Sequence, residues 1–270
     1  MSPADCSSRR GSNSNASSAN RDLPAVFAAD KCCIMKKIVV LIANYGSGKT
    51  EIALNLAMKA STEGKRTQVI DLDRINDYFR MSDQVKLLRE KKIDLVSPTF
   101  VGSGITQTNM PAAVNSAFDR DWDLVIFDVG GDPAGALSLA RYRTDFNRLL
   151  PEQIEVYDVV NVCRMMSQTP EKILKLKEDM EAFARMKVTG FIHNSNLQDL
   201  ASADDLRLGY PVLREASMSS GIPVVYTTAR KEFLHEFLQT PDLEERFIGT
   251  PLPLETFMYR SWANFADGGI

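Results

Sequence analysis

Residues 37–50 read KIVVLIANYGSGKT, and this stretch decides what the rest of the chain is expected to form. Its first six residues are mostly aliphatic and β-branched, which is typical of a buried parallel strand. The next eight are rich in glycine, and residues 51–58 have the apolar spacing of a helix. A strand, a glycine-rich loop ending in GKT and a helix together predict a phosphate-binding loop, or P-loop.

The residue types of this loop suit a polyphosphate. Gly46 and Gly48 let the backbone turn so that successive N–H groups face one anion, and the helix N-terminus adds positive potential. Lys49 is expected to reach the β- and γ-phosphates, and the Thr50 hydroxyl to bind Mg²⁺. Ala43 departs from the usual pattern, which has a glycine there. The residues predicted to bind the nucleotide in this stretch are Asn44, Tyr45, Gly46, Ser47, Gly48, Lys49, Thr50 and Glu51.

The composition is that of an ordinary soluble protein. Of 270 residues, 44% are hydrophobic and 25% are charged, and the formal net charge is −3. A slightly acidic chain argues against a surface that coats nucleic acid, so no nucleic-acid partner is expected. No apolar run approaches the ~20 residues of a membrane span. The four cysteines suggest no disulfide framework, which fits a reducing, cytoplasmic location.

The chain divides into two parts of different character. Residues 1–34 are rich in Ser and Asn and poor in aliphatic residues, which predicts a disordered N-terminal tail. Residues 35–270 are expected to form one nucleotide-binding domain. Its last segment, residues 254–265, has apolar residues at helical spacing and only one basic residue, Arg260. We expect a C-terminal helical extension that packs on the domain, because membrane-surface helices carry a basic face.

From Met35 onward, strand-like and helix-like runs alternate, which predicts an α/β fold. The fold class is a doubly wound, mostly parallel sheet of about seven strands with helices on both faces. The predicted strands are 37–42, 67–72, 93–96, 122–127, 154–163, 188–193 and 222–227. The predicted helices after the first are 82–91, 110–120, 133–146, 170–186, 203–219 and 229–238.

Ligands of such sheets lie at the carboxyl ends of the strands, so the residues after each strand matter. Asp71 and Asp73 follow the second strand, and the run DLVIFD ends in Asp128. An acidic residue that closes an aliphatic strand is the Walker-B arrangement, in which Asp128 would hold Mg²⁺. Gly131, three residues later, has the place of a switch glycine whose N–H reports on the γ-phosphate. The alternative for any strand-end aspartate is a helix N-cap or a turn residue.

Three stretches together resemble one class of P-loop ATPases. ANYGSGKTE, VIDLDRINDYF and FDVGGD are similar to motifs of the SIMIBI class, which includes plasmid-partition and septum-site proteins, the nitrogenase iron protein and the carbon-monoxide-dehydrogenase maturation ATPase. The nearest resemblance is to a bacterial group that shares the NYGSGKTE pattern. The resemblance implies that Asp73 positions the attacking water and makes Asp132 a second candidate for that role.

Two further matches to this class concern the base of the nucleotide. The run GFIHNSN at 190–196 is similar to a strand end whose asparagine contacts adenine in the iron protein, which assigns that contact to Asn194. The run IPVVYT at 222–227 resembles the neighbouring segment of the base pocket and adds Tyr226. Asn194 as a simple turn residue is the alternative.

The chain also departs from the class. Many members carry a lysine that reaches the phosphates of a dimer partner, and the matching residue here is Asn44. A homodimer therefore stays an open expectation. An iron–sulfur cluster is not implied, since no cysteine occurs between residues 33 and 163. The arginines considered as replacements for the lysine are Arg74, Arg141 and Arg143.

The predicted function is Mg²⁺-dependent ATP binding with slow ATP hydrolysis, which drives a conformational switch read by a protein partner. ATP is favoured over GTP because no Asn-Lys-x-Asp motif is present. One alternative is a small-molecule kinase that transfers the γ-phosphate, with residues 141–148 as its lid. Another is a scaffold that binds ATP and barely hydrolyses it.

Overall fold

The computed structural model describes residues 37–73, 81–97 and 110–258. These residues belong to one compact unit that begins at Met35. The predicted N-terminal tail and Arg74 lie outside the described residues, and so do residues 259–265 of the predicted C-terminal helix. No helix in the described ranges is both long and apolar enough to cross a membrane.

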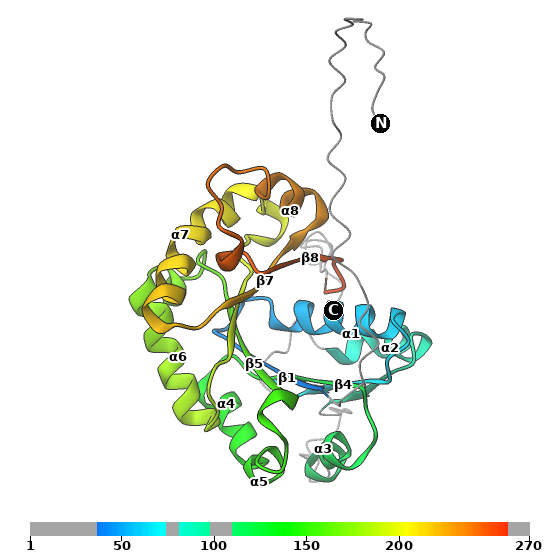
Figure 1. The fold of residues 1–270 in the computed structure, drawn as a ribbon. Coiled ribbons are helices and arrows are strands. Elements are labelled where there is room, and N and C mark those ends of the chain that lie inside the picture. Colours follow the sequence, from blue (N-terminus) through cyan, green and yellow to red (C-terminus); the bar gives the residue numbers. More distant parts are fainter. Residues whose placement is uncertain (1–36, 74–80, 98–109, 259–270) are drawn as a thin grey trace, which may run out of the picture. The chain divides into compact units, whose positions relative to one another are not determined.

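The described residues form one parallel sheet of eight strands in the order β3-β2-β4-β1-β5-β6-β7-β8 (Figure 1). Strand β1 lies inside the sheet, with β4, β2 and β3 on one side of it and β5 to β8 on the other. This confirms the doubly wound fold and adds one strand to the predicted seven. The strands are β1 (Lys37–Ile42), β2 (Thr67–Asp71), β3 (Ile93–Val96), β4 (Leu124–Asp128), β5 (Ile154–Val160), β6 (Gly190–His193), β7 (Val224–Arg230) and β8 (Thr250–Leu254).

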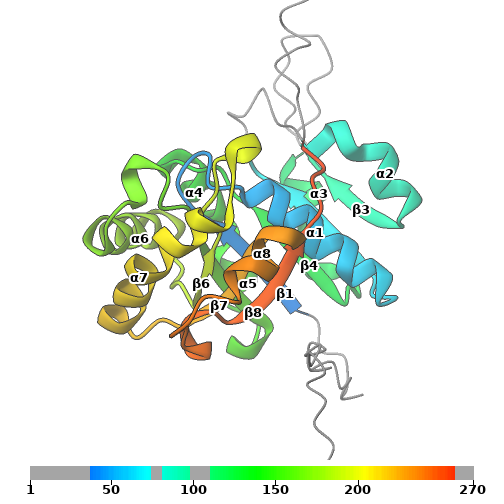
Figure 2. The same ribbon diagram turned by 90° about the horizontal axis from the view of Figure 1, so that it is seen from above.

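Helices cover both faces of the sheet (Figures 1 and 2). Helices α1 and α2 lie on one face, and α3, α4, α6 and α7 lie on the other. The α-helices of the described residues are α1 (Lys49–Thr62), α2 (Val85–Glu90), α3 (Met110–Asp119), α4 (Pro133–Ala140), α5 (Arg143–Phe146), α6 (Pro170–Ala184), α7 (Ala203–Ser220) and α8 (Lys231–Phe237).

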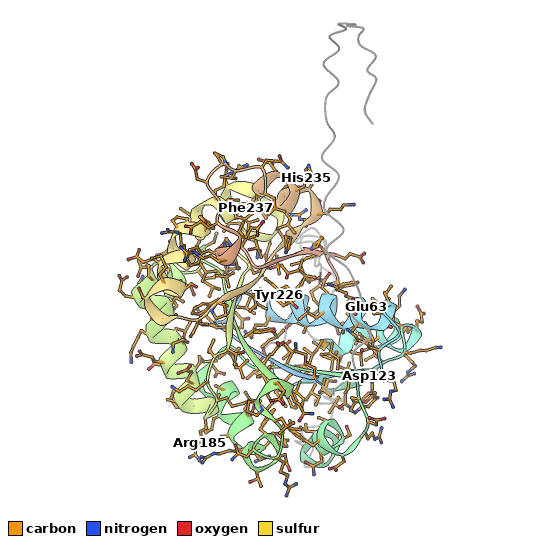
Figure 3. All side chains as sticks on the ribbon, viewed as in Figure 1. Glu63, Asp123, Arg185, Tyr226, His235 and Phe237 are labelled. Carbon is orange, nitrogen blue, oxygen red and sulfur yellow. The ribbon has the colours of Figure 1, made fainter. Side chains whose placement is uncertain are left out.

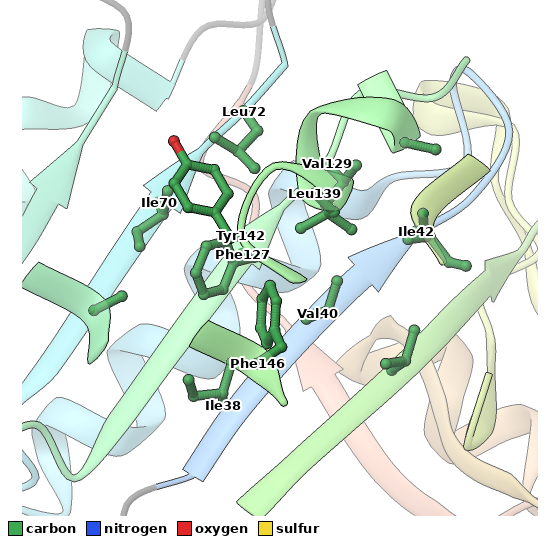
Figure 4. Close-up of a cluster of buried hydrophobic side chains, with 14 of the residues drawn as sticks. Ile38, Val40, Ile42, Ile70, Leu72, Phe127, Val129, Leu139, Tyr142 and Phe146 are labelled. Carbon is green, nitrogen blue, oxygen red and sulfur yellow. The ribbon is translucent and has the colours of Figure 1, made fainter. Parts of the chain in front are cut away.

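The core explains why the central strands are aliphatic throughout. Strand side chains alternate between the faces, so Phe127 packs under α3 and α4 while its neighbour Ile126 packs under α1. Figure 4 shows the first of these clusters, where the rings of Phe127 and Phe146 have centroids 5.4 Å apart. Both faces of the sheet are buried under helices, so the central strands are held firmly. The loops that follow their carboxyl ends therefore start from fixed positions.

Three larger features of the structure differ from the sequence prediction, apart from shifts of a few residues at the ends of other elements. The predicted helix 133–146 is interrupted after Ala140, giving α4 and α5. The predicted strand 154–163 ends at Val160, because the Asn161 side chain accepts a hydrogen bond from the N–H of Cys163 (3.0 Å) and closes a turn. Strand β8 was not predicted, since its sequence TPLPL contains two prolines. An edge strand tolerates proline, and among the described residues β8 pairs with β7 alone.

Candidate functional site

The P-loop joins β1 to α1 in a conformation that only glycine adopts easily. Gly46 and Gly48 have φ angles of +73° and +91°, and α1 begins at Lys49. The Asn44 carbonyl oxygen accepts hydrogen bonds from the Ser47 N–H (3.3 Å), the Ser47 hydroxyl and the Lys49 amine (3.3 Å). These three donors, two from Ser47 and one from Lys49, therefore point to the same side of the loop, where we expect the anion.

Thr50, in the first turn of α1, contacts Asp128 at the end of β4. The Thr50 hydroxyl donates a 2.6 Å hydrogen bond to Asp128 Oδ2. The other carboxylate oxygen, Oδ1, is buried and has no hydrogen-bond partner among the described residues. Burial raises the pKa of Asp128 to about 6, against the opposing effects of Lys49 and Thr50. A hydroxyl beside a carboxylate with one unpartnered oxygen fits a hard cation such as Mg²⁺.

Besides Asp128, three further carboxylates act electrostatically on the Lys49 amine. Burial lowers the pKa of this amine, while nearby carboxylates raise it, in decreasing order Asp128, Asp73, Asp158 and Asp132. The side chains of Asp73 and Asp132 lie near each other, because both approach Gly130. A Cβ added to Gly130 would come 3.5 Å from Oδ1 of Asp73 and 3.4 Å from Oδ1 of Asp132. The loops after β2 and β4 thus meet beside the P-loop.

Asp132 also has a structural task. Its Oδ1 accepts a 2.8 Å hydrogen bond from the Gly135 N–H and caps the N-terminus of α4, with Pro133 as the first helical residue. This is the N-cap alternative that the sequence left open. The proposed role of Asp132 in positioning water stays a prediction.

Gly131 packs directly on the P-loop. A Cβ added to Gly131 would come 2.7 Å from the backbone nitrogen of Tyr45 and 3.0 Å from the carbonyl carbon of Asn44. A side chain at residue 131 would therefore displace the loop. The Tyr45 side chain is exposed, and its own backbone N–H is bound by the Asn44 side chain (2.8 Å).

Asn194 is buried and holds the P-loop. Its amide nitrogen donates to the Ser47 carbonyl (2.8 Å), and its amide oxygen accepts from the Thr228 hydroxyl (2.8 Å). Both ends of the amide are thus bound by protein groups, one in the P-loop and one in β7. The contact with the base expected for Asn194 stays a prediction.

Tyr226 lies away from the carboxylate cluster around Lys49. Burial raises the pKa of its phenol, and the charges of Glu155 and Glu63 add to the effect. Glu155 binds Lys37 at the start of β1 (2.6 Å), and Glu63 follows the last residue of α1 (Glu63 and Tyr226 are labelled in Figure 3). The phenol is therefore nearest to charged groups at the amino ends of the strands, whereas the P-loop lies at the carboxyl ends. The contact with the base expected for Tyr226 stays a prediction.

Glu51 binds the protein's own C-terminal segment. Its carboxylate accepts hydrogen bonds from the N–H groups of Phe257 (2.5 Å) and Met258 (3.1 Å). Asn55, one turn further along α1, binds both the N–H and the carbonyl of Glu255. The predicted C-terminal helix is therefore not helical in its described part. Leu254 ends β8, and residues 255–258 form a non-helical strap bound to α1.

Of the three arginines considered as replacements for the missing lysine, the two that the structure describes lie away from the P-loop. Arg141 and Arg143 are exposed and follow the C-terminal end of α4, whereas Asp132 marks its N-terminal end. Arg164 was not predicted, yet its Nε donates a 3.1 Å hydrogen bond to the Gly46 carbonyl.

Asp158 is a second residue that the sequence reading missed. It interrupts the aliphatic strand β5, pairs with Ile42 of β1 and is buried. Burial raises its pKa to about 7, and the charge of Lys49 acts in the opposite direction. A lone aspartate within the strand run IEVYDVV was the available signal.

The parallel sheet, its strand order and the position of its P-loop define an α/β fold of the P-loop nucleoside triphosphatase type. No protein-family model and no curated protein sequence matches the chain. Solved structures do match. The receptor FtsY from Elizabethkingia anophelis in complex with GDP is 19% identical, with a TM-score of 0.50 over 79% of this chain and 66% of that one. FtsY from Thermotoga maritima is 19% identical, with a TM-score of 0.48 over 74% and 63% of the two chains.

A third match is the signal recognition particle 54 kDa protein from Aeropyrum pernix K1 in complex with GDP. It is 19% identical, with a TM-score of 0.45 over 71% of this chain and 41% of that one. The chain also spans only 58% of a second structure of the Elizabethkingia receptor. At this level of identity the likeness establishes the fold alone.

Proposed function

We propose that the protein binds a nucleoside triphosphate with Mg²⁺ at its P-loop, hydrolyses it slowly and switches conformation for a protein partner in the cytoplasm. The observation that carries this proposal is the contact between Thr50 and Asp128 beside the buried amine of Lys49. A hydroxyl, a carboxylate and a lysine in this arrangement suit a magnesium-bound polyphosphate.

Each residue has a distinct proposed role. Lys49 neutralises charge on the β- and γ-phosphates, Thr50 and Asp128 hold the cation, and Asp73 orients the attacking water. Bound Mg²⁺ supplies charge neutralisation at the phosphate oxygens. Asp73 is suited to orient water because it lies beside Gly130 and within the electrostatic reach of Lys49.

The identity of the base is the finer part of the proposal. We favour ATP, because the sequence lacks the Asn-Lys-x-Asp guanine motif. The structure of the Elizabethkingia receptor contains GDP, so guanine nucleotides are the direct competitor. Parallel titrations with MgATP and MgGTP decide between them.

The test of hydrolysis is phosphate release from each triphosphate without an added acceptor. Wild type should release phosphate slowly, and Asp73→Ala should keep nucleotide affinity while losing turnover. Equal loss of affinity and turnover would remove Asp73 from the water-positioning role. Tight binding without release, followed by release or transfer only when a small-molecule acceptor is added, would contradict a hydrolase and identify a kinase.

A further inference from the structure

Arg164 is the arginine that the structure places on the phosphate loop. Its Nε donates a 3.1 Å hydrogen bond to the Gly46 carbonyl. The guanidinium also covers the open side of that glycine, since a Cβ on Gly46 would come 3.3 Å from Nε and 3.4 Å from Cζ. The side chain therefore touches the loop through both polar and packing contacts.

The backbone of Arg164 is held in a defined turn after β5. Its N–H donates to the Asn161 carbonyl (3.1 Å), and its carbonyl accepts from the Ser167 N–H (2.9 Å). Asn161 is itself fixed, because its side-chain amide donates to the Asn196 carbonyl (3.0 Å) in the loop after β6. Arg164 therefore reaches the P-loop from a rigid base.

The contact controls the direction of a peptide group in the loop. A peptide unit is planar and trans, so its carbonyl and the N–H of the next residue point in opposite directions. With the Gly46 carbonyl held by Arg164, the Ser47 N–H faces the inside of the loop, where it meets the Asn44 carbonyl oxygen. Asn194 holds the next carbonyl, that of Ser47, in the same way.

The loop needs such a restraint. Gly46 and Gly48 lack side chains and have large conformational freedom, so an unrestrained loop loses more entropy when it orders around a phosphate. The residue at the signature-lysine position, Asn44, is neutral and uses its side chain to bind the Tyr45 N–H. Arg164 adds a fixed positive charge at a loop that lacks this lysine.

We propose that Arg164 is a positioning residue of the phosphate site. It holds the Gly46 carbonyl outward, so that the P-loop amides are already turned toward the diphosphate group that MgADP and MgATP, or their guanine counterparts, have in common. The inference rests on the proposed function. It assigns the role to an arginine of the same chain, in contrast to a lysine supplied by a dimer partner.

The experiment compares Arg164→Ala, Arg164→Lys and a control, Arg89→Ala. Arg89 is an exposed arginine in the last turn of α2. Calorimetric titration with MgADP, MgATP, MgGDP and MgGTP gives affinities, steady-state phosphate release gives kcat and KM, and thermal unfolding of the nucleotide-free proteins reports folding. Wild type and Lys49→Ala are measured alongside.

We expect Arg164→Ala to weaken di- and triphosphate binding alike by about tenfold, the effect of one lost charge-assisted hydrogen bond. KM should rise by the same factor and kcat should stay within about twofold. Lys offers one mobile donor in place of a planar fork, so Arg164→Lys should recover part of the affinity. Arg89→Ala should match wild type.

Three results would overturn the proposal: unchanged affinity in Arg164→Ala, a loss confined to kcat, or a lower unfolding temperature with normal affinity. If wild type binds nucleotide through Lys49 and Arg164→Ala binds equally well, only the role of Arg164 fails. If wild type binds none of the four nucleotides, the proposed function fails and the role of Arg164 fails with it.

Discussion

The hydroxyl of Thr50 and the carboxylate of Asp128 are joined by a 2.6 Å hydrogen bond, although 78 residues separate them in the chain. The contact exists because β1 and β4 are neighbours in register, with Leu41 opposite Asp128. Parallel strands bring their carboxyl ends to one edge, so the end of β4 lies beside the first turn of α1.

Replacing Asp128 with Asn should weaken Mg²⁺-dependent nucleotide binding by about tenfold or more. Asn still accepts the hydrogen bond from Thr50, but it removes the charge that favours a divalent cation. A Mg²⁺ titration at fixed nucleotide concentration measures the change. Asp123→Asn is the control, because Asp123 precedes β4 and binds Arg66 at the opposite edge of the sheet. Equal Mg²⁺ dependence in the two variants would contradict the assignment.

Asp132→Ala should destabilise the protein by about 1 kcal/mol, because the Gly135 N–H loses its capping partner. Urea unfolding provides the measurement. Asp132→Ser keeps a capping oxygen and should restore the stability. The same two variants test whether Asp132 also positions water. Low turnover in Asp132→Ser would favour water positioning, and normal turnover would leave Asp132 as a helix cap alone.

His193 should make folding sensitive to mild acid. Burial lowers the pKa of its ring from 6.5 to about 3. Between these values the unfolded state binds a proton that the folded state does not, so the contribution of His193 to stability falls as the pH drops below about 6.5. Above pH 7 it is constant. Urea unfolding at pH 7.5, 6.5 and 5.5 tests this.

Asp128 and Asp158 act in the opposite direction, because burial raises their pKa values to about 6 and about 7. Comparing wild type with His193→Gln isolates the contribution of His193 to the pH dependence of stability. The variant should lose less stability between pH 6.5 and pH 5.5 than wild type, and the exposed His235→Gln should follow wild type. Identical pH profiles for wild type and His193→Gln would refute the prediction.

Glu51→Ala should release the strap formed by Glu255–Met258. The carboxylate is the acceptor for the N–H groups of Phe257 and Met258, so both amides should exchange hydrogen at least about tenfold faster. Hydrogen-exchange NMR reads both positions directly. Glu63→Ala, at the other end of α1, is the control and should leave these two amides protected.

The sheet and the P-loop were predictable because their signals are local. The run KIVVLI is buried on both faces, and the glycines of the following loop have the positive φ angles that the pattern requires. Asp128 was found in the same way, as the residue that closes an aliphatic strand. Pro133 after Asp132 also signalled the N-cap that the structure shows.

The remaining features depend on contacts between distant residues. Glu51 is adjacent to the P-loop in sequence, yet its partner Phe257 lies 206 residues away. Arg164 lies 118 residues from Gly46, and no periodicity marks it. Tyr226 was assigned from resemblance alone, and its side chain packs against Tyr157 with ring centroids 6.0 Å apart. Sequence patterns report which face a residue occupies, but they do not report which distant side chain it meets.

The most direct measurement is calorimetric titration of wild type, Lys49→Ala and Lys49→Gln with Mg²⁺ and a non-hydrolysable analogue of ATP or GTP. The charges of four aspartates act on this one amine, so its removal should leave those negative charges uncompensated by Lys49 and disfavour a polyphosphate. We expect one nucleotide per wild-type chain, and binding weakened by about a hundredfold or more in both folded variants, as circular dichroism would verify. Wild-type affinity in a folded Lys49 variant would contradict the proposal that the P-loop binds a magnesium-bound triphosphate.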